Sequence, residues 1–403
     1  MRILCLDQFS SLGGGQSCLL DLLPGFHERG WPVQVALPDE GPFRDKLRGL
    51  GVPTHVLNCK SYSSTYKSIR ESFDYALELP RLVTMLARIC RSENIELLYV
   101  NGPRLLPVAA CVARFLKSDL VFHCHHRITQ NSAVRLAGEA LRLSRARVFA
   151  CCNFAADPLR PYASPHSLHI VYNGVAEMSV CLSAFRPTIR RIGVIGRIEP
   201  EKGQLEFVKA ARAVSRQFPD CTFSVTGAPL FSGGGYLQQV IHESCGLPIE
   251  FNGWQDDISS ILASLDLLVV PSVQFDATPR VILEAFSAGV PVLGFPTGGI
   301  SEIIENGHTG FLTAEATPAA LAASIVQISN LHPDTLAGVI AHARLSWEQK
   351  FNLNLFQQRI CSLLASSSES VTARKPDRTR RDSIYKRPGV NTKSETSAVL
   401  RQS

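Results

Sequence analysis

The chain contains 403 residues, of which 45% are hydrophobic and 19% are charged. A chain of this length accommodates two ordinary domains, and this composition excludes a disordered protein because it supplies a core to bury. The net charge of +6 is concentrated in residues 366–403, which hold nine Lys and Arg against four Asp and Glu, so the remainder is almost neutral and does not indicate a nucleic-acid-binding protein.

The twelve cysteines are scattered, without a CxxC pair or a Cys/His cluster at metal-ligand spacing. We therefore expect no metal site, no disulfide framework and a reducing compartment, the cytoplasm. Residues 2–6 read as a strand and are followed by Asp7, which is not the pattern of a signal peptide. Because no run of 18 or more uncharged apolar residues occurs, we expect no membrane-spanning segment.

The first half of the chain alternates short apolar strands with helical segments. The first strand is followed by a glycine-containing turn at residues 10–15 and by a helix over residues 16–29, which ends at Gly30. A further helix is expected at residues 107–116. The strands are expected at residues 2–6, 32–37, 97–100, 120–124, 148–152 and 169–171. Such alternation predicts a parallel α/β sheet, and we assign residues 1–175 to a first Rossmann-like domain.

Residues 176–190 are polar and irregular and read as a linker, after which the alternation resumes in a second domain, residues 191–346. Its strands are expected at residues 191–195, 222–225, 249–252, 267–270 and 290–294, and its helices at 204–218, 258–263, 278–288 and 318–329. A final amphipathic helix is expected over residues 347–364. Residues 366–403 read as a disordered basic tail, which is either solvated or in contact with anionic lipid or nucleic acid.

Ligands of open parallel sheets bind beyond the carboxyl ends of the strands, so the residues after each strand are candidates for a site. The most informative ones follow the strand at residues 267–270. Thr278 can cap the next helix, and Pro279 suits its first position. The backbone amides of Arg280 and Val281 then point off the helix start, where the helix dipole favours a phosphate.

Two acidic residues accompany this helix start. Asp276 precedes the helix, Glu284 lies in its second turn, and both could accept hydrogen bonds from hydroxyl groups of one sugar-containing ligand. Read in isolation, the pair would be one acidic residue near a helix start and another on an exposed helix face. The surrounding segment decides between these interpretations.

That segment, residues 276–312, reads DATPRVILEAFSAGVPVLGFPTGGISEIIENGHTGFL. It resembles the signature region of the family 4 (group 1) glycosyltransferases, whose GT-B fold consists of two Rossmann-like domains facing each other across a cleft. The family carries two acidic residues separated by seven, at the positions of Asp276 and Glu284. The resemblance implies that Asp276, where the family usually has Glu, contacts the transferred sugar, and that Glu284 contacts the nucleotide ribose.

A second segment follows the strand at residues 191–195 and reads GRIEPEKG. An Arg and a Lys five residues apart on a loop can converge on a diphosphate, although loop Arg and Lys are usually solvated. The resemblance implies that Arg197 and Lys202 match the basic pair of the family and neutralise the leaving nucleoside diphosphate, which stabilises the transition state. Gly196, which precedes them, is assigned to the same phosphate site.

Three glycines complete the expected donor site. Gly14 and Gly15, after the first strand, resemble the N-terminal glycine-rich loop of the family, whose backbone approaches a phosphate or an acceptor closely. Read alone, they could equally form a flexible turn. Gly253 lies where the family has its base-binding loop.

A run of histidines ends the strand at residues 120–124. The resemblance implies that His125 contacts the donor sugar, as a His at this strand end does in the family, with His126 as the fallback. Alternation along the strand places His123 and His125 on one side. Packed histidines without a catalytic role remain the alternative.

The resemblance implies a retaining, metal-independent glycosyltransferase that needs no cofactor. The second domain would bind a nucleotide-diphosphate sugar, and the first domain would bind most of a glycan or lipid-linked glycan acceptor, with residues 347–364 packed back on that first domain. A nucleotide-sugar epimerase of the same fold and a non-catalytic nucleotide-sugar-binding protein are the rival interpretations.

Lipid-linked glycan assembly is common in the family, so we expect a cytoplasmic protein with peripheral contact to the inner membrane face and no nucleic-acid partner. Four arginines surround an apolar helical segment at residues 133–143: Arg135, Arg142, Arg145 and Arg147. This pattern fits a membrane-facing basic patch and equally an ordinary solvated face.

Overall fold

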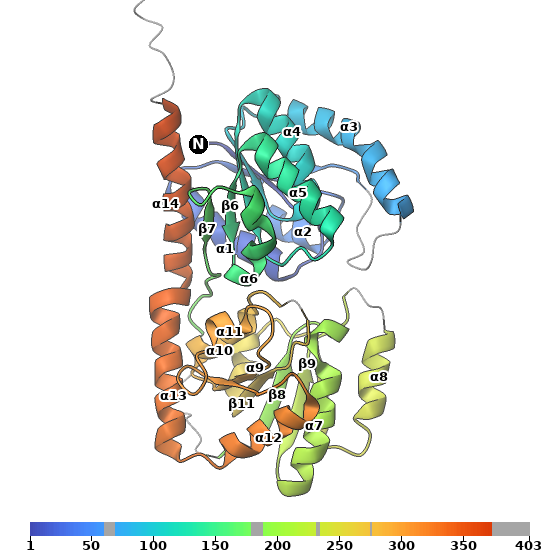
Figure 1. Ribbon diagram of the computed structural model, residues 1–403, viewed down its shortest axis with the longest axis vertical. Coiled ribbons are helices and arrows are strands. Elements are labelled where there is room, and N and C mark those ends of the chain that lie inside the picture. The colour runs from blue at the N-terminus through green and yellow to red at the C-terminus, as the bar shows by residue number, and fades with distance from the viewer. Residues whose placement is uncertain (60–68, 179–187, 231–233, 275, 373–403) are drawn as a thin grey trace, which may run out of the picture. The chain divides into compact units, whose positions relative to one another are not determined.

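The computed structural model describes residues 1–59, 69–178, 188–230, 234–274 and 276–372 (Figure 1). Within these residues two parallel β-sheets, each layered with helices, belong to one compact unit that comprises residues 1–361. The α/β class and the two Rossmann-like domains expected from the sequence are therefore confirmed.

In the described part of the chain, the first sheet has seven parallel strands in the order β3-β2-β1-β4-β5-β6-β7. Its strands are β1 (Ile3–Leu6), β2 (Val33–Leu37), β3 (Thr54–Val56), β4 (Leu97–Val100), β5 (Asp119–Cys124), β6 (Arg147–Ala150) and β7 (Leu168–Ile170). The sequence did not predict β3, because this strand has only three residues and none of them is fully buried.

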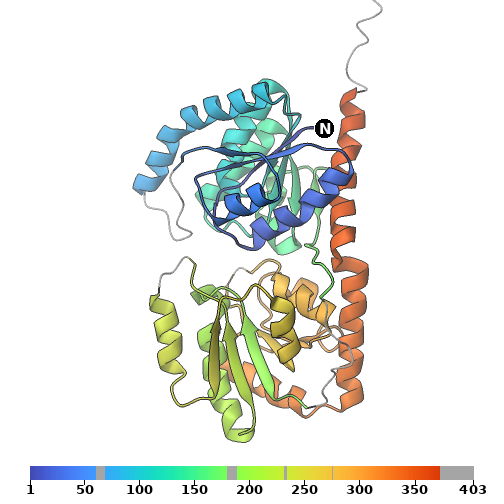
Figure 2. The same cartoon turned by 180° about the vertical axis from the view of Figure 1, so that it is seen from behind.

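Helices cover both faces of the first sheet. Figures 1 and 2 show α3 (Ile69–Ser92), α4 (Leu106–Leu116) and α5 (Asn131–Ser144) on one face and α1 (Gly14–Glu28) and α2 (Pro42–Gly49) on the other. Strands that are buried on both faces read as continuous apolar runs, which is why most of them were recognisable in the sequence.

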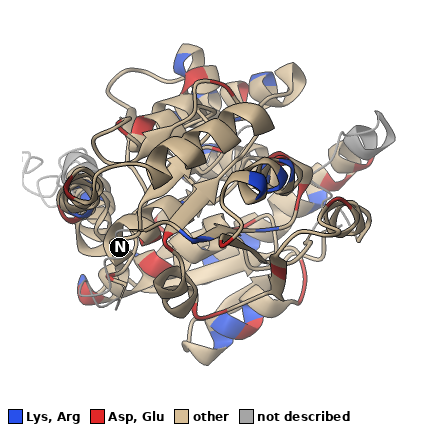
Figure 3. Ribbon diagram, turned by 90° about the horizontal axis from the view of Figure 1, so that it is seen from below, with Lys and Arg blue, Asp and Glu red and all other residues tan. Residues whose placement is uncertain are grey.

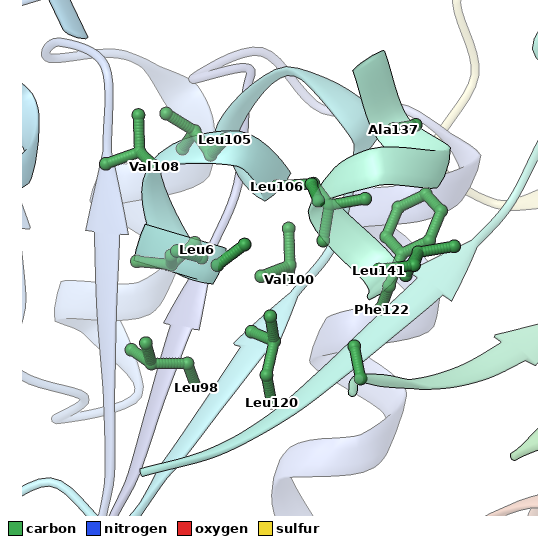
Figure 4. Close-up of a cluster of buried hydrophobic side chains, with 14 of the residues drawn as sticks. Leu6, Leu98, Val100, Leu105, Leu106, Val108, Leu120, Phe122, Ala137 and Leu141 are labelled. Carbon is green, nitrogen blue, oxygen red and sulfur yellow. The ribbon is translucent and has the colours of Figure 1, made fainter. Parts of the chain in front are cut away.

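The core under α3, α4 and α5 is built from alternate strand residues. Figure 4 shows Leu6 of β1, Val100 of β4 and Phe122 of β5 beside Leu106 of α4 and Leu141 of α5. None of these five side chains is more than 2% exposed. The sheet therefore has a rigid interior from which the polar residues after each strand project.

The second sheet has the strand order β10-β9-β8-β11-β12-β13 in the described residues, again all parallel. Its strands are β8 (Arg191–Ile195), β9 (Thr222–Thr226), β10 (Ile249–Gly253), β11 (Leu267–Val270), β12 (Val292–Gly294) and β13 (Phe311–Leu312). The sequence did not predict β13, which has only two residues and so carries no alternation signal.

The helices of the second sheet are α7 (Gln204–Gln217), α8 (Gly235–Glu243), α9 (Ile258–Ser264), α10 (Arg280–Ala288), α11 (Ile300–Ile303), α12 (Pro318–Ser329) and α13 (Pro333–Ser346). Alternation along β11 divides the core into two clusters. Leu267 and Val269 pack with α7 and α12, whereas Leu268 and Val270 pack with α9 and α10.

The expected helix over residues 347–364 is wrong at its start and its end. Residues Trp347–Phe351 form a π-helical turn that continues α13, and α14 (Leu353–Thr372) begins only after Asn352. Asn352 is extended, and its side chain accepts a hydrogen bond from the Asn354 amide at 2.8 Å, which starts a new helix. α14 extends to Thr372 and so includes residues 366–372 of the expected tail, whereas residues 373–403 lie outside the described residues.

The chain returns to the first sheet through the start of α14. Gln357 Nε2 donates to the backbone oxygen of Asp21 in α1 at 2.5 Å, and Cys361 Sγ donates to the oxygen of Gly25 at 3.6 Å. Before it, Trp347 Nε1 donates to the oxygen of Val175 at 3.2 Å. Residues 347–361 thus tie the second half of the chain to the first.

Of the expected linker, residues 176–178 and 188–190 are described, and the remainder lies outside the described residues. In Figure 3, Lys and Arg are interspersed with Asp and Glu over the described ribbon, as the nearly neutral charge of residues 1–365 requires. A search of the described helices for one long and apolar enough to cross a bilayer finds none.

The four arginines expected around residues 133–143 lie on different elements. Arg135 and Arg142 belong to α5, Arg145 follows it, and Arg147 is the first residue of β6. The Arg142 guanidinium donates to Glu139 at 2.9 Å and to the oxygen of Pro161 at 3.1 Å, and it lies 4.6 Å from the centre of the Tyr162 ring. Arg142 is therefore used within the fold, which sequence spacing along one helix could not reveal.

Trp347 provides a test of how the two halves are joined. Its side chain is 2% exposed, so Trp347→Ala should lower the free energy of unfolding by about 3–5 kcal/mol, measured by urea denaturation. Trp347→Phe should cost less, because it keeps the ring packing and loses mainly the hydrogen bond to Val175. Leu345→Ala is the matched control on α13, since Leu345 is 46% exposed and should change stability by no more than about 0.5 kcal/mol. Equal losses in Trp347→Ala and Leu345→Ala would contradict this assignment.

Candidate active site

Each sheet contains one point at which the strand order reverses, and open α/β sheets bind ligands beyond such points. In the first sheet the reversal lies between β1 and β4, and in the second between β8 and β11. Asp7 and Asn101 follow β1 and β4, whereas Gly196 and Pro271 follow β8 and β11. The candidate site residues of the second half therefore lie where the topology places a ligand site.

An ion pair joins the two loops at the second reversal. Lys202 Nζ donates to Asp276 Oδ2 at 2.5 Å, and Ser272 Oγ donates to the same oxygen at 2.8 Å. The side chains of Lys202 and Asp276 are 22% and 13% exposed. Two residues that the sequence assigned to one donor site thus lie in direct contact, 74 positions apart along the chain.

Close backbone packing fixes these loops. Gly203 has φ +72°, and a Cβ atom on it would lie 1.9 Å from the backbone oxygen of Pro271. Gly298 has φ +57°, and a Cβ atom there would lie 2.2 Å from the backbone oxygen of Asp276. Only glycine fits at either position, so Lys202 and Asp276 are carried by backbone segments in contact.

Arg197 and Lys202 belong to one short loop that ends in a 3-10 turn, Pro200–Lys202. The Arg197 guanidinium lies 3.5 Å from a carboxylate oxygen of Glu201, and the Arg197 side chain is 28% exposed. Gly196, at the start of the loop, donates its N–H to the oxygen of Thr226 at 3.0 Å. The loop therefore carries two positive charges at the carboxyl edge of the sheet.

The structure corrects the expected start of the helix in the signature segment, residues 276–312. α10 begins at Arg280, its N-cap is Pro279, and Thr278 makes no capping bond. Instead of accepting a helix N–H, Thr278 Oγ1 donates to the backbone oxygen of Cys151, after β6, at 3.1 Å. Arg280 and Val281 are thus the first two helical residues, one position earlier in the helix than expected, and their N–H groups belong to the turn that has no intrahelical acceptor.

The Arg280 side chain points to the first sheet. Its Nη1 lies 2.8 Å from the carboxylate of Asp21 in α1 and 3.4 Å from the oxygen of Gly174, and its Nε lies 3.7 Å from Glu284. Burial raises the pKa of Glu284, Arg280 lowers it, and Asp21 raises it again. Glu284 therefore stands beside a guanidinium and not on the exposed helix face considered above.

At the first reversal, a buried network connects three strand ends. Asp7 Oδ1 accepts from Gln16 Nε2 at 2.8 Å, and Asp7 Oδ2 accepts from Asn101 Nδ2 at 2.6 Å. Asn101 Oδ1 lies 2.6 Å from His125 Nε2. Sequence reasoning selected His125 and missed Asp7 and Asn101, although each is the polar residue directly after a buried strand at the same edge.

The histidines of this edge are in close contact, with their rings tilted against each other. The ring centres of His123 and His125 lie 3.9 Å apart, and Tyr99 Oη lies 2.6 Å from His123 Nδ1. Burial lowers the pKa of His123 to about 3 and lowers that of His125 well below its usual value, so both rings are neutral near pH 7. His126, the fallback choice, is exposed.

The glycines expected in a loop after β1 lie instead at the start of α1, which begins at Gly14 with Gly13 as its N-cap. Gly15 nevertheless belongs to the same edge. Its backbone oxygen accepts from Asn101 Nδ2 at 3.1 Å, and a Cβ atom on it would lie 3.4 Å from His125 Cδ2. The glycine segment and the histidine strand end are therefore in contact.

Gly253 ends β10 at the carboxyl edge of the second sheet. It has φ +64°, and its oxygen accepts from the Gly227 N–H at 2.8 Å. Trp254, the next residue, is 50% exposed. This exposed aromatic ring follows β10 at the carboxyl edge of the sheet and is available for stacking on a planar ligand group.

Glu302 is a residue that sequence reasoning did not single out. Its carboxylate accepts from the amides of Asn153 and Phe154 at 2.8 and 2.7 Å, from Asn153 Nδ2 at 3.0 Å and from Tyr172 Oη at 3.2 Å. It connects α11 with the short helix α6 (Asn153–Ala156) of the first sheet. Among the described residues, no group of three or more His, Cys, Asp or Glu side chains is arranged to hold a metal ion.

Two family profiles match the chain. The profile described as "Glycosyl transferase 4-like domain" matches residues 13–174, and the profile described as "Glycosyl transferases group 1" matches residues 189–330. The boundary between them coincides with the change from the first sheet to the second.

Curated relatives agree with these profiles. N-acetyl-alpha-D-glucosaminyl L-malate synthase of Bacillus anthracis is 31% identical over 79% of this chain and 85% of its own length. UDP-Gal:alpha-D-GlcNAc-diphosphoundecaprenol alpha-1,3-galactosyltransferase of Escherichia coli is 23% identical over 72% of this chain and 78% of its own. The protein WcaL of Salmonella typhimurium, assigned to colanic acid biosynthesis, is 32% identical, but the match spans only 29% of this chain and 30% of WcaL.

Solved structures share the fold. The Anabaena protein HepE in complex with UDP-glucose is 23% identical to the chain and superposes with a TM-score of 0.77 over 91% of this chain and all of HepE. This likeness shows the shared fold. The Bacillus anthracis relative, together with the two family profiles, shows that the chain belongs to the group 1 (family 4) glycosyltransferases.

Proposed function

We propose that the protein transfers a sugar from a nucleotide-diphosphate sugar to a glycan or lipid-linked glycan acceptor, with retention of the anomeric configuration. The observation that carries this proposal is the contact between Lys202 and Asp276 at the reversal of the second sheet, beside Arg197 and the start of α10. This arrangement combines fixed positive charge with carboxylate acceptors, and a diphosphate joined to a sugar requires both.

Arg197, Lys202 and the first amides of α10 would hold the diphosphate. As the bond to the sugar breaks, negative charge grows on the leaving phosphate, and positive groups on a preorganised backbone stabilise that charge without rearrangement. Because Lys202 already contacts Asp276, the same pair would place the sugar directly beside the leaving group. These protein charges would replace a divalent metal ion.

Glu284 would accept hydrogen bonds from the nucleotide ribose, and Asp276 would bind the transferred sugar. The retaining reaction would proceed on one face of the sugar, with the leaving phosphate taking the proton of the acceptor hydroxyl. The complexes of HepE with UDP-glucose and the galactosyltransferase that uses UDP-Gal make UDP-sugars the first donors to test.

The acceptor would lie against the first sheet. The diphosphoundecaprenol substrate in the name of the Escherichia coli relative supports a lipid-linked glycan acceptor. We propose in addition that the protein is cytoplasmic and contacts the inner membrane face. An epimerase of the same fold would instead convert the donor without an acceptor, and a non-catalytic binder would leave it intact. Chromatography of the donor with and without acceptor separates these three outcomes.

Nucleotide binding should depend on Lys202. In a thermal-shift screen, a ligand at ~100 times its dissociation constant adds about 2.7 kcal/mol of stability, so UDP or another nucleoside diphosphate should raise the melting temperature clearly. Lys202→Ala should weaken that binding by roughly 1.5–3 kcal/mol, because it removes a charge-assisted contact. Lys209→Ala, which removes an exposed charge from α7, is the control and should bind normally. Equal binding by both variants would remove Lys202 from the donor site.

Glu284 should be required for turnover and not for folding. Glu284→Gln keeps the shape of the side chain beside Arg280 and weakens its role as an acceptor, so kcat/KM for the donor should fall by about 10–100-fold, corresponding to roughly 1.5–3 kcal/mol. Release of nucleoside diphosphate measures this. Glu305→Gln, at an exposed ion pair with Lys350, should retain wild-type turnover. Full activity of Glu284→Gln would refute the assignment to the ribose.

Metal removal should not abolish transfer. If Arg197 and Lys202 neutralise the diphosphate, an excess of EDTA should leave kcat within a factor of about two of its starting value. A large loss of activity that Mg²⁺ or Mn²⁺ restores would show that a metal ion, and not the protein charges, carries this role.

A further inference from the structure

The network at the reversal of the first sheet fixes a hydrogen-bond direction. Asn101 Nδ2 lies 2.6 Å from Asp7 Oδ2 and 3.1 Å from the backbone oxygen of Gly15, while Asn101 Oδ1 lies 2.6 Å from His125 Nε2. An ionised carboxylate and a carbonyl oxygen can only accept, so the amide nitrogen must face both of them. The amide oxygen therefore faces the imidazole, and His125 Nε2 must carry the proton.

His125 Nδ1 is then a lone-pair acceptor. This atom is buried and has no hydrogen-bond partner in the structure, which is costly unless a donor reaches it from a ligand. Burial and the nearby His123, His126 and Arg280 all lower the pKa of His125, so Nδ1 stays unprotonated near neutral pH. His125 is therefore a neutral ring in one fixed tautomer whose Nδ1 has no donor, and this nitrogen is suited to accept a hydrogen bond from a hydroxyl group.

Resting on the proposed function and extending it, we propose that Asp7 and Asn101 are positioning residues that hold His125 in its Nε2–H tautomer, so that Nδ1 accepts a hydrogen bond from a hydroxyl group of the sugar substrate. Asp7 must be a carboxylate for this, because both of its oxygens accept. Its Oδ1 accepts from the Phe9 amide at 2.9 Å and from Gln16 Nε2 at 2.8 Å, and its Oδ2 accepts from Asn101.

The tautomer can be measured without any substrate. In the full-length protein with ¹⁵N-labelled histidine, long-range ¹H–¹⁵N correlation spectra distinguish a protonated from an unprotonated ring nitrogen, and His125→Gln identifies the signal. Burial raises the pKa of Asp7 to about 6, with Cys5 as its ionisable neighbour on β1, so spectra at about pH 8 report the ionised carboxylate. We expect the proton on Nε2; a wild-type His125 with its proton on Nδ1 would overturn the inference.

Asp7→Asn should move that proton. The Phe9 N–H belongs to the backbone and cannot turn, so the new amide keeps its oxygen there and directs its nitrogen at Asn101. Asn101 must then turn its own oxygen to that nitrogen, which gives up its bond to the Gly15 oxygen, and turn its nitrogen to His125. This shifts the imidazole proton to Nδ1. A folded Asp7→Asn variant with the wild-type tautomer would contradict the proposed role of Asp7.

A double exchange provides the rescue. In Asp7→Asn/Asn101→Asp, the carboxylate at position 101 accepts from both the new amide and His125 and gives up only the bond to the Gly15 oxygen, so the proton should return to Nε2. Gln16→Leu is the matched control, because it removes a buried hydrogen bond to Asp7 and leaves the bond to Asn101 intact. A role in folding alone predicts instead that Gln16→Leu and Asp7→Asn behave alike.

Activity provides an independent readout. With the donor found in the nucleotide screen, Asp7→Asn should lower kcat/KM roughly tenfold, as expected for one hydrogen bond, and the double exchange should recover most of that loss. An inverted tautomer with unchanged kcat/KM would overturn the sugar contact. Absence of any turnover in the wild-type protein would instead contradict the proposed function, while the tautomer result would still stand.

Discussion

The reversal of strand order in each parallel sheet is the constraint on which the candidate site depends. On either side of the reversal the connections leave in opposite directions, so the strand ends there are not covered by a crossover helix. Asp7 and Asn101 lie at this point in the first sheet, and the loops with Lys202 and Asp276 lie at it in the second. Polar side chains gather at these points because the hydrophobic strands end there.

The two reversals have different physical characters. At the second sheet the contact of Lys202 with Asp276 is partly open to solvent, and glycine backbones hold its two loops together. At the first sheet the charge of Asp7 is buried, and three hydrogen-bond donors compensate for its lost hydration. The partly open contact at the second sheet suits the exchange of a charged ligand. The buried network at the first sheet suits a side chain that must keep one orientation.

Contacts between the halves explain why the signature helix departs from its local pattern. Thr278 donates to the oxygen of Cys151 instead of accepting an N–H of its own helix, and Arg280 binds Asp21. Glu302 caps the amides that begin α6, although its own helix belongs to the second sheet. In each case the side chain bonds a partner distant in the sequence, so residues next to Asp276 and Glu284 join the candidate site to the first sheet.

The sequence by itself determined the two α/β domains, because strands buried on both faces are continuous apolar runs and the segment after residue 275 carries a dense motif. It also selected Lys202, Asp276 and His125, since each follows a recognisable strand. It did not reveal β3 and β13, whose few residues carry no periodic signal, or the break at Asn352, where one side chain starts a new helix inside an apolar pattern.

Only the tertiary structure decided which side chains of the candidate site contact one another. The pairing of Lys202 with Asp276, the network of Asp7 and Asn101, and the four donors around Glu302 all join residues distant in the chain. Such hydrogen bonds form only when the donor–acceptor distance is correct to within a few tenths of an ångström and the donor points at the acceptor. Periodicity along a sequence specifies neither the distance nor the direction.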